Sequence, residues 1–250
     1  MSNYSESNGK VALVTGANKG LGFEMSRQLA QHGLTVIIAA RKLEAAVAAA
    51  TKLKNEGLKA EAILLDINDS IQIQSAVQEI KNRFGKLDVL INNAGVMLDG
   101  EWAISNASSV SVDMIRKTFD TNFFALVEVT QAMLPLILKS QSGRIVNMAS
   151  IEGSLTLHAD PSSFIYDSKP FAYDASKAAV NSFTVHLAHE LRNTPVKVNS
   201  AHPGWVKTEL GGDGAMMDIT EGAKTGVQLA TLPDDGASGG FFHLGQPVPW

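Results

Sequence analysis

The 250-residue sequence contains no cysteine, which excludes disulfides, Cys-ligated metal sites and Cys nucleophiles. Charged residues make up only 18% of it, the net charge is −4, and no dense Lys/Arg run occurs, so we expect no nucleic-acid partner. No apolar run reaches the roughly 20 residues that span a bilayer. The polar start MSNYSESNGK has no apolar signal-peptide region. We therefore expect a cytoplasmic protein with no membrane partner.

Short apolar runs that alternate with helical patterns fill most of the chain. Runs rich in Val, Ile and Leu are typical of strands buried on both faces, and they lie at 10–16, 34–40, 60–65, 87–92, 143–149, 196–201 and 241–245. Helical patterns lie at 20–32, 43–56, 70–84, about 111–140, 172–193 and 220–230. This alternation predicts an α/β fold, a Rossmann-type doubly wound parallel sheet of about seven strands with helices on both faces. We expect a flexible N-terminus (1–9) and one domain (10–250).

The glycines of KVALVTGANKGLGFE follow the first apolar run and open the first helical pattern. Gly16, Gly20 and Gly22 would let the backbone approach a pyrophosphate, which the helix N-terminus also favours. Their spacing, G-x-x-x-G-x-G, differs from the commoner dinucleotide fingerprint. A tight turn without a ligand gives the same pattern, so this loop alone leaves nucleotide binding open.

The ordered motifs of the chain resemble the short-chain dehydrogenase/reductase family. They are TGANKGLG (15–22), NNAG (92–95), a catalytic set at Asn122, Ser150, Tyr173 and Lys177, and Pro203-Gly204 after the sixth strand. The resemblance is closest to the carbonyl-reductase-like branch, through TGANKGLG, TNFFALVEVTQAMLPLI and GGFFHLGQPVPW. It implies a cofactor site formed by Gly16, Asn18, Lys19, Gly20, Leu21, Gly22, Arg41, Asp66, Ile67, Asn93, Ala94, Gly95, Tyr173, Lys177, Pro203, Gly204, Val206 and Thr208.

Two tyrosines compete for the catalytic position, because YDSK (166–169) nearly repeats in YDASK (173–177). Tyr173 and Lys177 are four residues apart in an Ala-rich segment that predicts a helix, so they share one helix face. Pro170 disfavours helical geometry at the residue before it, which separates Tyr166 from its lysine. The family usually places the tyrosine nearer to the serine, which favours Tyr166. We choose Tyr173, interpret 151–171 as an insertion and regard Tyr166 as a loop residue.

Carbonyl reduction requires a hydride at carbon and a proton at oxygen. A free tyrosine has a pKa near 10, and an ammonium about 4 Å away stabilises a phenolate by about 4 kcal/mol, or about 3 pKa units. We therefore expect Lys177 to bring the pKa of Tyr173 near neutrality. The resemblance implies that Ser150 hydrogen-bonds the developing alkoxide and that Lys177 holds the nicotinamide ribose. It also implies that Asn122 is linked to the lysine through water. The alternatives are a strand-end hydroxyl for Ser150 and a helix-packing amide for Asn122.

The second apolar run ends in TVIIAARKLEA, without the acid that binds the ribose 2′-OH of NAD. Arg41 there and Lys19 in the glycine loop favour a 2′-phosphate and hence NADP(H), with Lys42 a weaker candidate. The alternative is that these are solvated surface cations. Asp66 resembles the family's adenine-contacting acid, although an aspartate in this place is more often a helix N-cap.

The segment 204–219 is rich in glycine and carries Trp205, Met216 and Met217, which predicts an adaptable lid over a small hydrophobic carbonyl substrate. His158, His186 and His189 show no metal-ligand spacing, and we expect no metal. The sequence thus predicts NADPH-dependent reduction of a ketone or aldehyde. The alternatives are an oxidative alcohol or hydroxysteroid dehydrogenase and, last because the catalytic set is intact, a non-catalytic NADP-binding sensor. Monomer and homo-oligomer both remain open.

Overall fold

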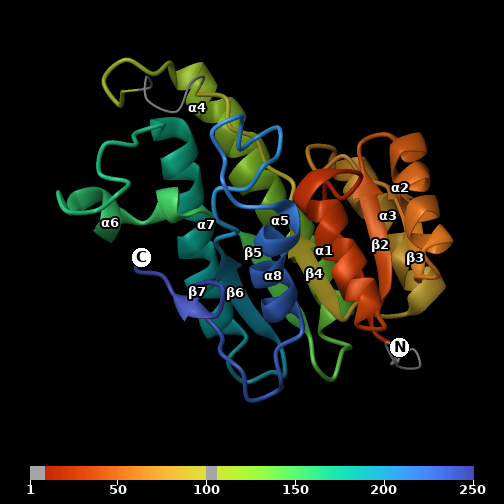
Figure 1. Ribbon diagram of the computed structural model, residues 1–250. Coiled ribbons are helices and arrows are strands. Elements are labelled where there is room, and N and C mark those ends of the chain that lie inside the picture. Colours follow the sequence, from red (N-terminus) through yellow and green to blue (C-terminus); the bar gives the residue numbers. More distant parts are fainter. Residues whose placement is uncertain (1–8, 100–105) are drawn as a thin grey trace.

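A computed structural model describes residues 9–99 and 106–250. All the strands in these residues belong to one sheet (Figure 1). The strands are β1 (Val11–Val14), β2 (Thr35–Ala40), β3 (Ala60–Leu64), β4 (Val89–Asn92), β5 (Arg144–Met148), β6 (Lys197–Ala201), β7 (Phe241–His243) and β8 (Gln246–Pro247). Their order is β3-β2-β1-β4-β5-β6-β7-β8, with parallel pairing from β3 to β7. The predicted doubly wound sheet is confirmed.

The eighth strand corrects the expected number of about seven. It is only two residues long and pairs antiparallel with β7, so it has no apolar periodicity that would identify it. Most of the predicted flexible N-terminus lies outside the described residues. No helix in the described part of the chain combines the length and the apolar character needed to cross a membrane.

Helices pack on both faces of the sheet because successive strand residues point to opposite faces. Ala12 and Val14 of β1 join one core with α1 (Gly20–Gln31), α2 (Leu43–Asn55) and α8 (Ile219–Ala230). Val11 and Leu13 join the opposite core, which contains residues of α3 (Ser70–Phe84), α5 (Ala125–Ile137) and α7 (Phe171–Glu190). Both faces of β1 are therefore buried, which explains its continuous apolar sequence.

The long helix expected at about 111–140 is interrupted. It consists of α4 (Val112–Phe119), a π-helical turn η1 (Asp120–Phe124) and α5. The segment 151–171, which we interpret as an insertion, contains a 3-10 turn η2 (Ile151–Gly153) and a short helix α6 (Leu155–Ala159) before α7 begins. Figure 1 shows α6 beside α7, away from the N-terminal half of the sheet.

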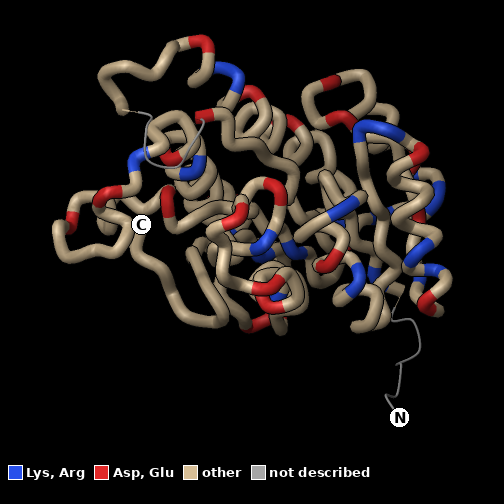
Figure 2. The backbone as a smooth tube through the Cα atoms, turned by 45° about the horizontal axis from the view of Figure 1, so that its top comes forward, with Lys and Arg blue, Asp and Glu red and all other residues tan. Residues whose placement is uncertain are grey.

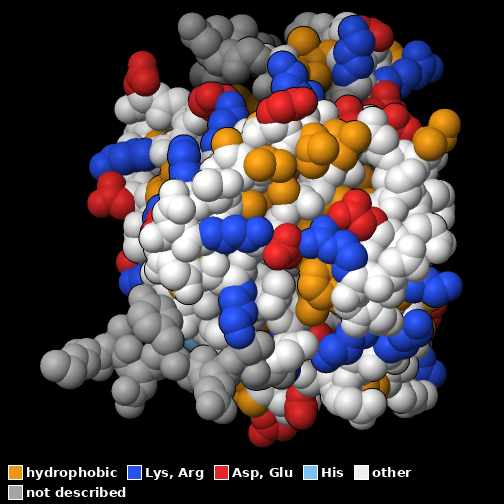
Figure 3. Space-filling model, turned by 90° about the vertical axis from the view of Figure 1, so that its right-hand side faces the viewer, with side chains coloured by type: hydrophobic (Ala, Val, Ile, Leu, Met, Phe, Trp, Pro, Cys, Tyr) orange, Lys and Arg blue, Asp and Glu red, His pale blue; other side chains and the backbone are white. Residues whose placement is uncertain are grey.

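The strand order reverses between β1 and β4, where a doubly wound sheet binds its ligand at the carboxyl ends of the strands. Positive and negative residues occur side by side on the helices and loops (Figure 2). On the side formed by α2, α3 and β3, apolar side chains lie among charged ones (Figure 3), and the exposed ones include Leu43, Val47, Leu64 and Ile71.

Candidate active site

The predicted cofactor residues lie at one edge of the sheet, after the carboxyl ends of five strands. They are Gly16, Asn18, Lys19, Gly20, Leu21 and Gly22 after β1, Arg41 after β2, Asp66 and Ile67 after β3, Asn93, Ala94 and Gly95 after β4, and Pro203, Gly204, Val206 and Thr208 after β6. Strand order alone places these loops together, although they are distant in sequence.

The glycine loop packs directly on the loop after β4. Gly16 has a φ of +63°, and a Cβ at Gly22 would lie 2.4 Å from Nδ2 of Asn93. Asn93 Nδ2 in turn donates to the Thr15 carbonyl (2.8 Å), and the Thr15 hydroxyl accepts from the amides of Asn93 and Ala94 (2.9 and 3.1 Å). Helix α1 begins at Gly20 without a side-chain cap from Lys19. The glycines thus leave the N-terminus of α1 open to a ligand, whereas larger side chains in this loop would obstruct it.

Asn122 occupies the π-helical turn and is almost fully buried. Its Oδ1 accepts from the Val96 amide (2.7 Å), while its Nδ2 donates to the Val96 carbonyl (2.8 Å) and to Ser176 Oγ on α7 (3.0 Å). A Cβ at Gly95 would lie 3.2 Å from Asn122 Oδ1 and 3.5 Å from Lys177 Nζ. Asn122 therefore joins the loop after β4 to α7, as the packing amide of the alternative interpretation would, and its predicted link to Lys177 stays a prediction.

Helix α7 carries Tyr173 and Lys177 on one face, as the spacing predicts, and both are buried. Lys177 Nζ donates to the Met148 carbonyl (2.8 Å) and lies 5.5 Å from the centroid of the Tyr173 ring. Ser150, two residues after the end of β5, hydrogen-bonds to the Tyr173 side chain. Its hydroxyl also accepts from the Glu152 amide (3.3 Å), the backbone bond of the alternative interpretation, while its contact with an alkoxide stays a prediction.

The expected pKa of Tyr173 near neutrality is wrong for the protein itself. Burial raises the pKa of Tyr173 above its ordinary value, the hydrogen bond from Ser150 lowers it, and the charges of Glu152 and Asp174 raise it. Burial also lowers the pKa of Lys177 to about 8, because a desolvated ammonium is less stable. Desolvation of both groups thus outweighs the attraction between them.

Tyr166 lies in a turn, 39% exposed, and no helix includes it. The Lys169 ammonium lies 5.0 Å from the centroid of its ring and also contacts the Tyr166 carbonyl. Tyr166 is thus the loop residue that Pro170 predicts, and the structure brings only Tyr173 together with Ser150, Lys177 and Asn122.

The two proposed phosphate-binding cations differ in their surroundings. Arg41 is exposed, and its side chain has no ion-pair partner among residues 9–99 and 106–250. Lys19 forms an ion pair with Glu209 (2.5 Å), between the glycine loop and the segment 204–219. Sequence reasoning missed Glu209, because nothing in the sequence places it beside the glycine loop.

The N-cap alternative for Asp66 is wrong. Asp69 caps α3, accepting from the amides of Ile71 and Gln72 (2.9 and 3.2 Å). Asp66 instead accepts from the Asn68 amide (3.0 Å) in a turn just after β3. Its place at the carboxyl edge of the sheet remains compatible with an adenine contact.

The segment 204–219 folds back on itself beside the glycine loop. Val206 pairs with Met217, and Trp205 Nε1 donates to the Gly211 carbonyl (2.8 Å). Met216 is largely exposed, and Glu209 of this segment forms the ion pair with Lys19 of the glycine loop. The expected lid therefore lies against the cofactor loop and has an exposed apolar side chain.

Sequence reasoning missed two features at the start of α7. Asp99, from the loop after β4, accepts from the amides of Ala172 and Tyr173 (2.8 and 3.0 Å) and so caps the catalytic helix. Glu152, His158 and Asp174 converge within 4.8 Å of one another, although their spacing resembles no ligand motif. Only the fold brings these residues together.

Comparisons of the sequence and of the structure with known proteins agree with one another. Residues 10–216 match the family model described as short chain dehydrogenase. The chain is 34% identical to (+)-neomenthol dehydrogenase from Capsicum annuum over 94% of its length and 95% of the relative, and 31% identical to salutaridine reductase from Papaver bracteatum over 95% of each. The NADPH-bound carbonyl reductase from chicken fatty liver superposes with a TM-score of 0.82 at 25% identity, covering 96% and 99% of the two chains.

Proposed function

Because the chain belongs to the short-chain dehydrogenase/reductase family, we propose that it reduces a ketone or aldehyde to an alcohol, with NADPH as hydride donor and Tyr173 as proton donor. The relatives are named as dehydrogenases or reductases, which supports redox chemistry between a carbonyl group and an alcohol. The observation that carries the proposal is the buried group of Tyr173, Ser150 and Lys177 at the carboxyl edge of the sheet.

The residues at this edge fit a dinucleotide. The glycine loop exposes backbone rather than side chains beside the N-terminus of α1, which suits a pyrophosphate. Arg41 follows β2 as an exposed cation without a protein partner in the described chain, which suits a 2′-phosphate. Lys19 would join it by exchanging Glu209 for the phosphate. NADP-bound neighbours, such as the gluconate 5-dehydrogenase from Burkholderia cenocepacia, support the same choice.

Bound NADPH supplies a hydride to the carbonyl carbon. Tyr173 then donates its phenolic proton to the carbonyl oxygen, and Ser150 holds that oxygen by hydrogen bonding as negative charge develops. Lys177, anchored by the Met148 carbonyl, places a positive charge under the ring that stabilises the phenolate left behind. Asn122 holds the loop after β4 against α7 and so keeps these groups aligned.

The protonated state of Tyr173 supports its proposed role as a proton donor. Its pKa is raised by burial, so the phenol carries its proton at neutral pH and is ready to donate it. An oxidative dehydrogenase would need the phenolate as the base at the start of its reaction. The segment 204–219 and the exposed Met216 support a hydrophobic carbonyl substrate.

NADPH consumption against a panel of ketones, aldehydes and quinones tests the proposal, with NADH as the competing cofactor. We expect turnover of at least one hydrophobic carbonyl, dependent on Tyr173. Tight NADPH binding without turnover of any member would favour a non-catalytic sensor. Faster oxidation of alcohols than reduction of the matching ketones near neutral pH would favour the oxidative dehydrogenase.

A further inference from the structure

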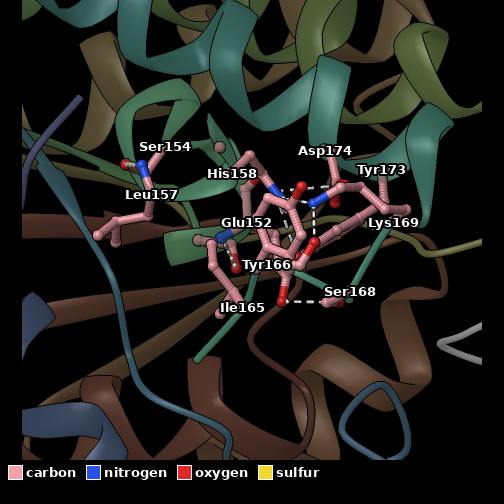
Figure 4. A network of polar contacts seen from close by, with 12 residues as sticks. Glu152, Ser154, Leu157, His158, Ile165, Tyr166, Ser168, Lys169, Tyr173 and Asp174 are labelled. Atoms are coloured by element: carbon pink, nitrogen blue, oxygen red, sulfur yellow. Dashed lines mark hydrogen bonds and ion pairs between the residues drawn. The ribbon is translucent and has the colours of Figure 1, made fainter. Parts of the chain in front are cut away.

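A buried group of titratable side chains lies beside the start of α7. Glu152 comes from η2, His158 from α6 and Asp174 from the first turn of α7 (Figure 4). His158 Nε2 lies 3.5 Å from Glu152 Oε2 and 3.3 Å from Asp174 Oδ2. Ser168 donates to Glu152 Oε1 (3.1 Å), and Lys169 Nζ lies 3.1 Å from His158 Nδ1. These five residues, called the acid cluster below, join the segment 151–171 to the catalytic helix.

Two carboxyl groups of the acid cluster are too close and too buried to be ionised together. Glu152 is 7% exposed, and Glu152 Oε2 and Asp174 Oδ1 are buried without a hydrogen-bond partner in the described chain. Burial raises the pKa of Glu152, and burial with the charges of Glu152 and Asp99 raises the pKa of Asp174 to about 9. One shared proton, carried mainly by Asp174, satisfies this arrangement.

A metal ion fits the acid cluster less well than a proton. A metal-bound histidine normally donates its other ring N–H to an acceptor. Here Nδ1 of His158 faces the Lys169 ammonium, which can only donate, so the ring proton lies on Nε2 and points to the Glu152 carbonyl (2.9 Å). Burial lowers the pKa of His158, which keeps the ring neutral. Nε2 is therefore a donor rather than a ligand, and Lys169 already supplies the positive charge.

We propose that Glu152 and Asp174 share one proton and act as positioning residues, which hold the segment 151–171 against α7 and keep Tyr173 protonated for donation. The proposal rests on the proposed reduction. Asp174 directly follows Tyr173 on α7, and Glu152 follows Ser150 by two residues. A negative charge on either carboxyl group disfavours a phenolate nearby.

The other charged or titratable groups that face Tyr173 and the carboxyl pair come from four elements. They are Asp99 after β4, His158 on α6, Lys169 before α7 and Lys177 on α7. His158 is neutral, and Lys169 lowers the pKa of Asp174. The negative charges of Asp99 and the carboxyl pair therefore act against the positive charges of the two lysines. A single proton changes the charge of the carboxyl pair and so adjusts this balance of charge.

The shared proton makes stability depend on pH in a defined direction. The pKa of Asp174 is raised in the folded protein, so the folded chain binds a proton that the unfolded chain releases at lower pH. Stability is therefore greatest at low pH and falls as the pH rises towards about 9, where the second carboxyl group ionises. Asp174→Asn should flatten this decline, because an amide keeps a hydrogen-bond donor for Glu152 without a titrating proton.

Kinetics as a function of pH test the link to Tyr173. The variants are Asp174→Asn and Glu152→Gln, with Asp167→Asn, an exposed carboxylate of the same segment, as the matched control. We expect the alkaline limb of kcat/KM for reduction to move down by about one pH unit in Glu152→Gln, as one lost charge implies at an intermediate dielectric. It should move less in Asp174→Asn, because Asp174 carries the shared proton and is neutral below about pH 9. Profiles identical to Asp167→Asn would overturn the link.

Two further measurements test the shared proton without relying on turnover. Isotope-edited infrared spectra of the full chain at pH 7 should show a protonated carboxyl band that Asp174→Asn removes. The thermal midpoint should fall more steeply between pH 6 and 9 in the unmodified protein than in that variant. Absence of the band, or stabilisation by Zn²⁺ or Mn²⁺ that Asp174→Asn abolishes, would contradict the shared proton, the latter in favour of a metal site. If the protein reduces no carbonyl, the proposed function and the proposed effect on Tyr173 are both wrong. The infrared and thermal measurements still test the shared proton, because neither depends on turnover.

Discussion

Two tyrosine–lysine pairs lie within twelve residues of each other, and their local geometry is similar. The lysine ammonium lies 5.5 Å from the ring centroid in Tyr173–Lys177 and 5.0 Å in Tyr166–Lys169. The surroundings differ, because Tyr173 is buried on a helix beside Ser150 whereas Tyr166 lies in an exposed turn. Burial, a serine just after β5 and a fixed lysine thus distinguish the proposed proton donor from a tyrosine in a surface cation–π contact.

The two lysines show the same difference in their own partners. Lys177 donates to the Met148 carbonyl in the interior, and burial lowers its pKa to about 8. Lys169 is exposed and contacts His158 and the Tyr166 carbonyl. Only a desolvated ammonium acts strongly on its neighbour, since water screens an exposed one.

Replacing the two tyrosines separately gives the largest expected contrast. Tyr173→Phe keeps the packed ring and removes the proton donor, so kcat for reduction should fall roughly 10²- to 10⁴-fold. NADPH binding, measured by fluorescence titration, should change little. Tyr166→Phe, the matched control, should retain nearly full activity. Loss of activity in Tyr166→Phe with retention in Tyr173→Phe would reverse the assignment.

Replacing the two lysines should give the next largest contrast. Lys177→Met removes a charged interaction worth roughly 1.5–3 kcal/mol, so kcat/KM should fall about 10- to 150-fold. NADPH binding should weaken as well. The alkaline limb of the reduction profile should move up, because a phenolate without a nearby cation is less stable. Lys169→Met should show none of these changes, and an unchanged profile in Lys177→Met would remove this lysine from the mechanism.

The exposed cations Arg41 and Lys19 extend the comparison to the cofactor. Two charged hydrogen bonds to a 2′-phosphate, about 1.5–3 kcal/mol each, should give NADPH a preference over NADH of about a hundredfold or more. Rising salt should reduce it, because these cations face water. Ala40→Asp with Arg41→Ala should move the preference towards NADH. Equal kcat/KM for the two cofactors in the unmodified protein would contradict the assignment.

Replacing Glu209 tests whether Lys19, the cation in the glycine loop, contacts the phosphate. It pairs with Lys19 on the surface, a contact worth about 0–1 kcal/mol. Glu209→Gln should therefore strengthen NADPH binding up to about fivefold without affecting NADH. Weaker NADPH binding in this variant would mean that Lys19 does not reach the phosphate.

The last contrast compares the stabilities that the caps of two helices provide. Asp99→Ala leaves the first amides of α7 without their acceptor and should lower the free energy of unfolding by about 0.5–2 kcal/mol, as measured by urea denaturation. It should also lower kcat, because the amide of Tyr173 is one of the two groups involved. Asp69→Ala at α3 should cost similar stability and leave kcat unchanged. Equal kcat in both variants would limit Asp99 to a structural role.

The sequence predicted the features that short-range chemistry decides. The apolar runs gave seven of the eight strands, and the four-residue spacing of Tyr173 and Lys177 identified one helix face. Pro170 identified the exposed tyrosine correctly, since the restriction it imposes is local. The two-residue β8 and the π-helical turn at Asn122 were missed, because neither has a periodic pattern.

Only the tertiary structure decided which distant segments interact and which energies depend on burial. Asp99 caps α7 from 73 residues away, and Glu152, His158 and Asp174 meet only because η2, α6 and α7 fold together. The direction of the pKa of Tyr173 belongs here too, because desolvation depends on every atom that excludes water from the ring. The sequence by itself determined the fold, because periodicity, proline restriction and helix spacing act over a few residues, and its ordered motifs supplied the reacting groups that we propose. Their electrostatic states required the packed protein.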